Sequence, residues 1–400
     1  MTIDKNNKTA VIDISTDVLI ISSAVEVFKL AIDIANAGYK TMVAGKHELS
    51  AVSSIAQECG VKILHKEILV NLSGVPGNFK VTFKKDNETV QRIFGAIVVA
   101  GHYEVELLNE SYGLKFLNNV ITLSKLEEIL HDYKPEINNI AFLAGFAHEG
   151  TVLDTKRVLK CMSTLQDMEE INTYLYINNI KVAQHDVEKE FTTVRDKGAI
   201  TFKLTEMPQI TQTESSLKIL FQDPVIRKTV EHSPDLIVVE DRMIPAGINA
   251  EIAQILKIDI TKSGFLQKDN VHRFPVQSNR EGIFVTGHAR DVMTYSEYLI
   301  DSDNVVLRVK EFLGNGEKSV PLNKAVVNDD KCTICLTCYR CCPHGAIEID
   351  GDRAVISSIA CQGCGICASE CPMDAIQIIG FNDDDLKVEI KNATHVYENN

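Results

Sequence analysis

Nine of the 11 cysteines fall between Cys332 and Cys371, and eight of these form two copies of one pattern. The first copy is Cys332-x2-Cys335-x2-Cys338-x3-Cys342-Pro343, and the second is Cys361-x2-Cys364-x2-Cys367-x3-Cys371-Pro372. In bacterial two-cluster ferredoxins this run holds [4Fe-4S] clusters, and the fourth cysteine of each run ligates the other cluster. We therefore expect one cluster on Cys332, Cys335, Cys338 and Cys371, and a second on Cys361, Cys364, Cys367 and Cys342.

The spacing within each copy has a physical reason. Two residues between ligands let a tight loop wrap one cluster, and the three-residue step carries the chain towards the neighbouring cluster. Ala346-Ile347 and Ala375-Ile376 follow the two runs and are small and apolar enough to pack beside the clusters. Gly363 and Gly365 suit a close backbone approach. Zinc sites also use CxxC pairs, but they close with four ligands, so eight ligands in two copies favour iron–sulfur clusters.

The remaining three cysteines are not expected to be cluster ligands. Cys341 lies beside a predicted ligand and is expected to be a spare thiol. Cys59 and Cys161 stand alone, and we expect both to be small core residues.

Charge and the N-terminal sequence limit the possible partners and location. The formal net charge of −14 disfavours nucleic acid and anionic membrane surfaces and suits a basic protein surface. The N-terminus shows no apolar stretch of the signal-peptide type. Charged residues interrupt the apolar run from Val18 to Ile34, so that run cannot span a bilayer. These features predict a cytoplasmic protein without a membrane span.

The sequence from Asp17 to about Gly45 reads as the opening of a dinucleotide-binding fold, with a buried strand, a helix and a second strand. The glycine fingerprint is missing from its turn. The three glycine positions of G-x-G-x-x-G fall on Ser22, Ala24 and Val27, and the acidic position at the end of the second strand falls on Gly45. Side chains at the glycine positions and no acid at the strand end argue against a bound FAD.

A second nucleotide-fold start is possible at Ile140–Leu143, which precedes Gly145-Phe146-Ala147-His148-Glu149-Gly150. Two glycines five residues apart are a weak signal, and an ordinary strand-to-helix loop is the better interpretation. A helix is expected from about Asp154 to Asp167, and buried strands at Asp235–Val239 and Gly282–Gly287, with a helix after Asp291.

Several segments in order resemble HdrA, the iron–sulfur flavoprotein component of heterodisulfide reductase, and its relatives over almost the whole chain. They are Val18–Gly45, Gly74–Val81, Gly95–Gly101, Gly113–Thr122, Gly264–Leu266, Glu281–Gly287 and the cysteine runs. The resemblance implies an α/β chain with a degenerate FAD/NAD(P)-binding, thioredoxin-reductase-like fold of two Rossmann-type units. An α+β two-cluster bacterial ferredoxin-like domain would follow. Family members bind FAD and iron–sulfur clusters and act as electron hubs in larger assemblies.

Three departures from that family pattern bear on function. The glycines for the FAD phosphates are absent, as described. The family's inserted cluster domain is also absent, because only Thr82 to Phe94 joins the flanking strands. The late flavin-contacting motif ends in Thr286-Gly287-His288, and we interpret His288 as a loop residue. The expected chain is a shortened relative that kept the scaffold and terminal clusters and lost the flavin.

The expected organisation has five segments. A first Rossmann-like unit spans 1–135, a second nucleotide-fold-like unit spans 136–235, and 236–318 returns to the first unit. The ferredoxin-like domain occupies 319–382, and an acidic and polar tail occupies 383–400, beginning with Asp383-Asp384-Asp385.

The favoured function is electron transfer through two [4Fe-4S] clusters by a non-catalytic component of a multisubunit redox complex, plausibly of an anaerobe. Its partners would be other redox subunits, with a ferredoxin or a hydrogenase- or dehydrogenase-type donor, and a homodimer is possible. One alternative is an FAD-dependent oxidoreductase with a divergent flavin site. Another is a scaffold subunit whose clusters stabilise the fold.

Overall fold

A computed structural model describes residues 2–4, 9–22, 24, 26–45, 52–65, 67–86, 88–117, 119–132, 137–168, 170–181, 186–213, 216–266 and 276–398. Parts of the expected segments fall outside these ranges: Ser23, Val25, Asn118, the expected boundary at 135, and Asn399–Asn400. The chain forms two compact units, one of residues 1–103 and 245–400 and one of residues 104–244. The finer five-segment division stays a prediction.

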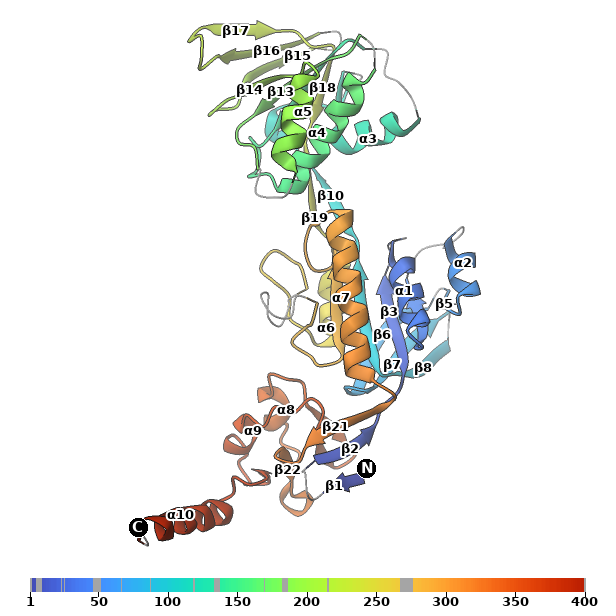
Figure 1. The fold of residues 1–400 in the computed structure, drawn as a ribbon, viewed down its shortest axis with the longest axis vertical. Coiled ribbons are helices and arrows are strands. Elements are labelled where there is room, and N and C mark those ends of the chain that lie inside the picture. Colours follow the sequence, from blue (N-terminus) through green and yellow to red (C-terminus); the bar gives the residue numbers. More distant parts are fainter. Residues whose placement is uncertain are drawn as a thin grey trace. The chain divides into compact units, whose positions relative to one another are not determined.

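The first unit is built on a five-stranded parallel sheet of order β20-β9-β3-β4-β5 (Figure 1). Its strands are β3 (Asp17–Ser22), β4 (Lys40–Ala44), β5 (Lys62–Leu64), β9 (Ala96–Gly101) and β20 (Ile283–Gly287). The helices are α1 (Val27–Asn36), α2 (Val52–Glu58), α6 (Ile248–Leu256) and α7 (Tyr295–Leu313). An antiparallel sheet comprises β6 (Ile68–Val75), β7 (Asn78–Lys85) and β8 (Glu88–Phe94).

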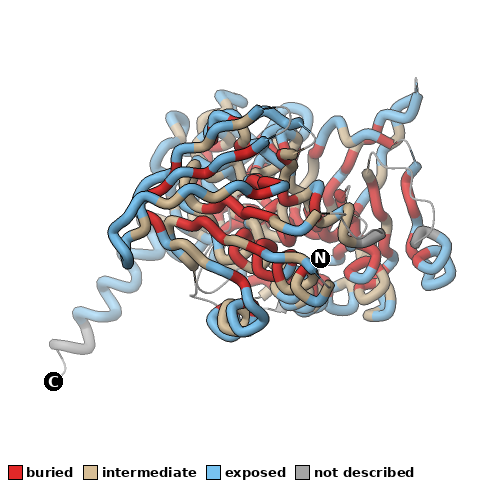
Figure 2. The backbone as a smooth tube through the Cα atoms, turned by 90° about the horizontal axis from the view of Figure 1, so that it is seen from above, coloured by how far each residue is buried: buried red, intermediate tan, exposed pale blue. Residues whose placement is uncertain are grey.

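Alternation along the strands divides the core into two layers, and Figure 2 shows buried residues following the central strands. Val18 and Ile20 of β3 face a layer that includes α1 and α7, where Val27 and Val309 are buried. Leu19 of β3 belongs to the other layer, which contains α6 and the antiparallel sheet. Because both faces are covered, these strands read as continuous apolar runs in the sequence.

The second unit repeats this plan with a parallel sheet of order β11-β18-β12-β13-β14. Its strands are β11 (Val120–Thr122), β12 (Asn139–Ala144), β13 (Asn172–Ile177), β14 (Ile200–Lys203) and β18 (Leu236–Val239). The helices α3 (Leu123–Asp132), α4 (Val152–Gln166) and α5 (Val187–Asp196) pack on one face. An antiparallel sheet packs on the other, formed by β15 (Gln209–Gln212), β16 (Leu217–Gln222) and β17 (Thr229–His232).

In both units the chain forms an antiparallel sheet after it leaves the parallel sheet, and the strand that follows then re-enters the parallel sheet. β9 pairs with β3 after the β6–β8 sheet, and β18 pairs with β12 after the β15–β17 sheet. A 3₁₀ helix (Asn109–Tyr112) precedes β11. The chain crosses between the units in β10 (Tyr103–Leu107) and β19 (Asp241–Pro245), which pair with each other.

The cysteine module (residues 325–378) lies in the first unit and is a small α+β structure. Its elements are β22 (Ala325–Val327), a 3₁₀ helix (Asp329–Lys331), α8 (Thr337–Cys341), β23 (Ile347–Asp350), β24 (Arg353–Ile356), α9 (Ile366–Ser369) and β25 (Ile376–Ile378). β22 pairs with β25, and β23 pairs with β24, both antiparallel. Before the module, β1 (Thr2–Asp4), β2 (Thr9–Asp13) and β21 (Glu317–Pro321) form an antiparallel sheet.

The acidic Asp383–Asp385 run opens α10 (Asp383–Glu398), whose described side chains are exposed. Across the described part of the chain, none of the helices is long and apolar enough to cross a membrane.

Candidate iron–sulfur site and nucleotide-fold turns

The first predicted ligand set lies around one small cavity. Cys332, Cys335 and Cys338 of the first run line it together with Cys371 of the second, and apolar side chains such as Ile376 complete the wall. Four cysteine sulfurs around an apolar cavity are the donor set that a [4Fe-4S] cluster uses, so these residues fit that group.

Cys342 of the first run lies near Cys367 of the second. Burial raises the pKa of the Cys367 thiol to about 12, and the next largest contributions come from Cys361, Cys342, Cys341 and Cys364. Such contributions weaken with distance, so both Cys341 and Cys342 lie within reach of Cys367. The assignment of these two groups as cluster ligands stays a prediction.

Backbone amides already point at several of the sulfurs. Ala346 N donates to Cys342 Sγ at 3.4 Å, and Ala375 N donates to Cys371 Sγ at 3.3 Å. Gly363 N donates to Cys361 Sγ at 3.4 Å. N–H groups directed at sulfur stabilise negative charge there and are one of the features that set cluster potentials.

The two runs share backbone conformation as well as spacing. Ile334 (φ 55°) and Leu336 (φ 63°) of the first run stand where Gly363 (φ 66°) and Gly365 (φ 83°) stand in the second. All four are left-handed, which is uncommon for a β-branched residue such as Ile334. The repeated conformation at strained positions indicates that the loop shape serves the ligand geometry.

Alanine substitutions at Gly363 and Gly365 distinguish the cost of the left-handed backbone from the cost of a steric contact. A Cβ at Gly363 would lie 3.1 Å from the Asn323 carbonyl oxygen, whereas a Cβ at Gly365 would meet nothing within 4 Å. We expect Gly365→Ala to cost about 1–2 kcal/mol, for the left-handed backbone alone, and Gly363→Ala to cost more. Thermal unfolding of anaerobic protein, read with its iron content, measures both, and equal losses would contradict a role for the Asn323 contact.

Within the described ranges, no three His, Cys, Asp or Glu side chains converge closely enough to hold a single metal ion.

The other cysteines are placed as expected with one exception. Cys161 is buried in the core of the second unit, and Cys341 is half-buried with its Sγ 3.5 Å from the Cys338 carbonyl oxygen. Cys59 is exposed, so its prediction as a core residue is wrong. It follows the last turn of α2, where its amide donates to Ile55 O and Gly60 turns the chain through a left-handed residue, φ 85°.

The turn after β3 is closed by its own side chains. Ser22 Oγ accepts a hydrogen bond from Ala24 N at 3.0 Å, and Val27 is 1% exposed within the core. Gly45 is half-buried directly after β4. His288 follows β20 and packs edge-on against Tyr103, with ring centroids 4.7 Å apart. Burial lowers the pKa of His288. At Ser22, Ala24 and Val27, the described members of this turn and its helix start, side chains stand where a pyrophosphate-binding loop has glycines.

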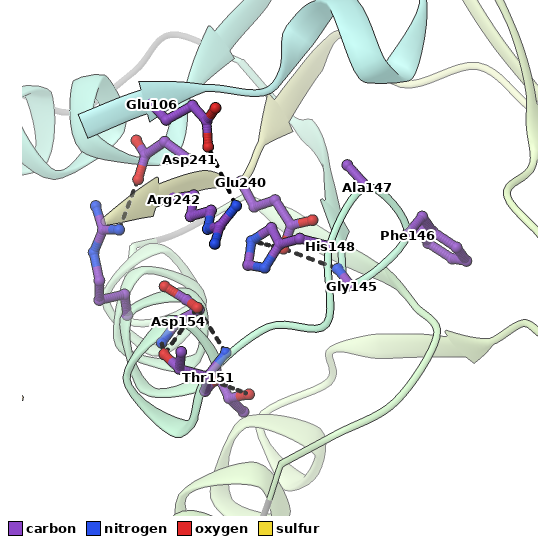
Figure 3. A network of polar contacts seen from close by, with 12 residues as sticks. Glu106, Gly145, Phe146, Ala147, His148, Thr151, Asp154, Glu240, Asp241 and Arg242 are labelled. Carbon is purple, nitrogen blue, oxygen red and sulfur yellow. Dashed lines mark hydrogen bonds and ion pairs between the residues drawn. The ribbon is translucent and has the colours of Figure 1, made fainter. Parts of the chain in front are cut away.

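The corresponding turn of the second unit, after β12, is closed by Glu240 and Tyr112. Figure 3 shows Glu240 beside Gly145 of this turn. Gly145 N donates to Glu240 Oε2 at 2.8 Å, and the Tyr112 hydroxyl donates to Glu240 Oε1 at 2.6 Å. The same hydroxyl accepts from Phe146 N and Ala147 N at 3.3 and 3.4 Å. Glu240 is 2% exposed, and burial raises its pKa. An internal carboxylate and a phenol thus occupy the amides that a phosphate would use.

This closure predicts that neither NADH nor NADPH binds at the β12–α4 turn. The amides are satisfied, and an ionised Glu240 would repel a pyrophosphate. Isothermal titration of the full chain should give no saturable binding at ligand concentrations up to about 1 mM. Saturable binding that protects this turn from hydrogen exchange would contradict the prediction.

A family model described as a 4Fe-4S dicluster domain matches residues 324–372, which contain all eight predicted ligands. The chain is 24% identical over 322 residues to the HdrA component of the ferredoxin:CoB-CoM heterodisulfide reductase of Methanosarcina acetivorans, covering 68% of this chain and 40% of that protein. It is 23% identical over 293 residues to the iron-sulfur HdrA component of the CoB–CoM heterodisulfide reductase of Methanocaldococcus jannaschii, covering 67% and 44%. The chain spans less than half the length of these relatives.

The fold is similar to that of a solved thioredoxin reductase from Lactococcus lactis. The TM-score is 0.50 at 16% identity, and the match covers 75% of this chain and 99% of the reductase. This confirms the expected α/β class with two Rossmann-type units. The chain is therefore similar in sequence to HdrA components of heterodisulfide reductases, and it joins a thioredoxin-reductase-like fold to a segment that matches a 4Fe-4S dicluster domain.

Proposed function

We propose that the chain relays electrons through two [4Fe-4S] clusters within a multisubunit redox complex related to heterodisulfide reductase. The observation that carries the proposal is the cavity lined by Cys332, Cys335 and Cys338 of one run together with Cys371, the last cysteine of the other. When bound, each cluster accepts and returns one electron.

The residues around the two sets suit transfer between a partner and the interior of the module. Cys335 and Cys364 are exposed, which gives each set one edge at the surface. Cys338, Cys361 and Cys367 are buried, which keeps part of each set away from solvent. The arrangement supports an entry edge on one set and an exit edge on the other.

We propose that no flavin takes part. Ser22, Ala24, Val27 and Gly45 lack the fingerprint that binds the FAD pyrophosphate and ribose, and Ser22 already satisfies the Ala24 amide. The specific alternative is a flavin-dependent oxidoreductase with a divergent site, and the thioredoxin-reductase-like fold is the observation that favours it. Flavin absorbance released on denaturation would support that alternative.

The relatives' names suggest the partners. The Methanosarcina protein is named as part of a ferredoxin:CoB-CoM heterodisulfide reductase. A ferredoxin or another low-potential donor, together with other redox subunits, is therefore the proposed setting. We propose a cytoplasmic location for the complex.

A reductive titration under anaerobic conditions tests this function. Dithionite should deliver about two electrons per chain, and each should develop the signal of a reduced [4Fe-4S] cluster in electron paramagnetic resonance (EPR). Ferredoxin, supplied reduced, should deliver the same electrons. Clusters that no donor reduces would instead favour a scaffold role.

A further inference from the structure

The loops that follow the fourth cysteine of each run differ in charge at one equivalent position, occupied by Gly345 and Asp374. Gly345 (φ 57°) stands three residues after Cys342, and Asp374 (φ 48°) stands three residues after Cys371. Both are left-handed, and the next amide in each loop donates to the cysteine sulfur. The backbones match, but one loop carries an exposed carboxylate where the other carries no side chain.

Arg280, from outside the module, fills the space at Gly345. Its Nε lies 2.9 Å from where a Cβ of Gly345 would be, so any larger residue there would displace the guanidinium. Arg280 is 2% exposed, its Nη1 donates to Leu256 O at 2.7 Å, and it lies over the ring of Phe79 at 5.8 Å. The scaffold thus holds a cation against the loop that carries Cys342.

The charge of Arg280 is not cancelled by a direct partner. Across the described ranges no carboxylate forms an ion pair with it, and its Nε has no hydrogen-bond partner. Glu348 is the acid with the largest influence on it, and Glu348 lies 3.9 Å from Lys257 instead. A guanidinium keeps its proton at ordinary pH even when buried, so a net positive charge remains at this loop.

We propose that Arg280 raises the reduction potential of the second set (Cys361, Cys364, Cys367 and Cys342) above that of the first. A nearby positive charge favours the form that has gained an electron, and burial reduces screening by water and salt. Asp374 acts in the opposite sense at the first set. The inference rests on the proposed relay and gives it a direction: one electron leaves the first set, which is oxidised, and reduces the second, with no bond made or broken.

The test is an EPR-monitored redox titration of the full anaerobic chain, in which Cys335→Ser and Cys364→Ser variants assign the two signals. Arg280→Met should lower the potential of the second set and leave the first unchanged. Arg280→Lys, which keeps the charge, should restore most of the difference. Arg308→Met on α7, in an exposed ion pair with Glu311, is the control and should move neither potential.

Glu348→Gln provides a test that leaves the buried arginine in place. It removes the opposing carboxylate and should raise the potential of the second set. If Arg280→Met binds its full iron and the potential of the second set does not change, the role of Arg280 is overturned. If Arg280→Met fails to fold, an unchanged potential in Glu348→Gln overturns it. Absence of reducible clusters in the unaltered protein would instead overturn the relay itself.

Discussion

Replacing Cys371 by serine is expected to remove the same cluster as replacing Cys335, although Cys371 lies in the other run. The reason is the shared cavity, which Cys371 lines together with Cys332, Cys335 and Cys338. Iron and acid-labile sulfide should each fall from about eight to about four per chain. The EPR signal that remains should be identical in Cys371→Ser and Cys335→Ser, and it should be the signal lost in Cys342→Ser.

Cys341→Ser is the matched control, because Cys341, the last residue of α8, directly precedes Cys342 and is not a predicted ligand. It should keep about eight irons per chain. If Cys371→Ser instead left the signal that Cys364→Ser leaves, each run would hold its own cluster and the crossed assignment would be wrong.

Arg157→Met is expected to lower the free energy of unfolding of the second unit by about 3–5 kcal/mol, since it leaves a buried carboxylate without its cation. Arg157 Nη1 donates to Asp241 Oδ1 at 2.7 Å, and Asp241 is 0% exposed. Figure 3 shows Asp241 next to Glu240. Arg157 also donates to Glu127 at 2.7 and 3.0 Å and to Ser124 Oγ at 2.8 Å. The network links α3, α4 and the start of β19.

Hydrogen exchange of peptides from α4 and β18 in the full chain measures this loss. Lys218→Met is the control, because Lys218 forms an exposed ion pair with Glu231 at 2.8 Å and should change stability by only about 0–1 kcal/mol. Equal protection in the two variants would show that the Arg157 network does not hold the second unit together.

The sequence predicted the cysteine module because its information is local. Ligand spacing, the prolines and Gly363 and Gly365 all lie within a few residues of the atoms that they position, and the structure places both glycines in left-handed conformations. The buried strands were predictable for a similar reason, since a strand covered on both faces is apolar at every position. β3 and β12 appear where the apolar runs are.

The contacts that refine function were not predictable, because each joins residues distant in sequence. Glu240 meets Gly145 across 95 residues, and Arg280 meets Gly345 across a gap filled by β20, α7 and β21. Neither residue stands in a recognisable motif. The prediction that Cys59 is a core residue was wrong for another reason. Cysteine is often buried, but Cys59 directly follows a short helix and lies at the surface.

Iron, acid-labile sulfide and flavin, determined together on protein purified without oxygen, test the central claim most directly. The account predicts about eight irons and eight sulfides per chain and no flavin. Stoichiometric FAD beside the same iron would contradict the loss of the flavin site and make the chain a flavin-dependent electron hub.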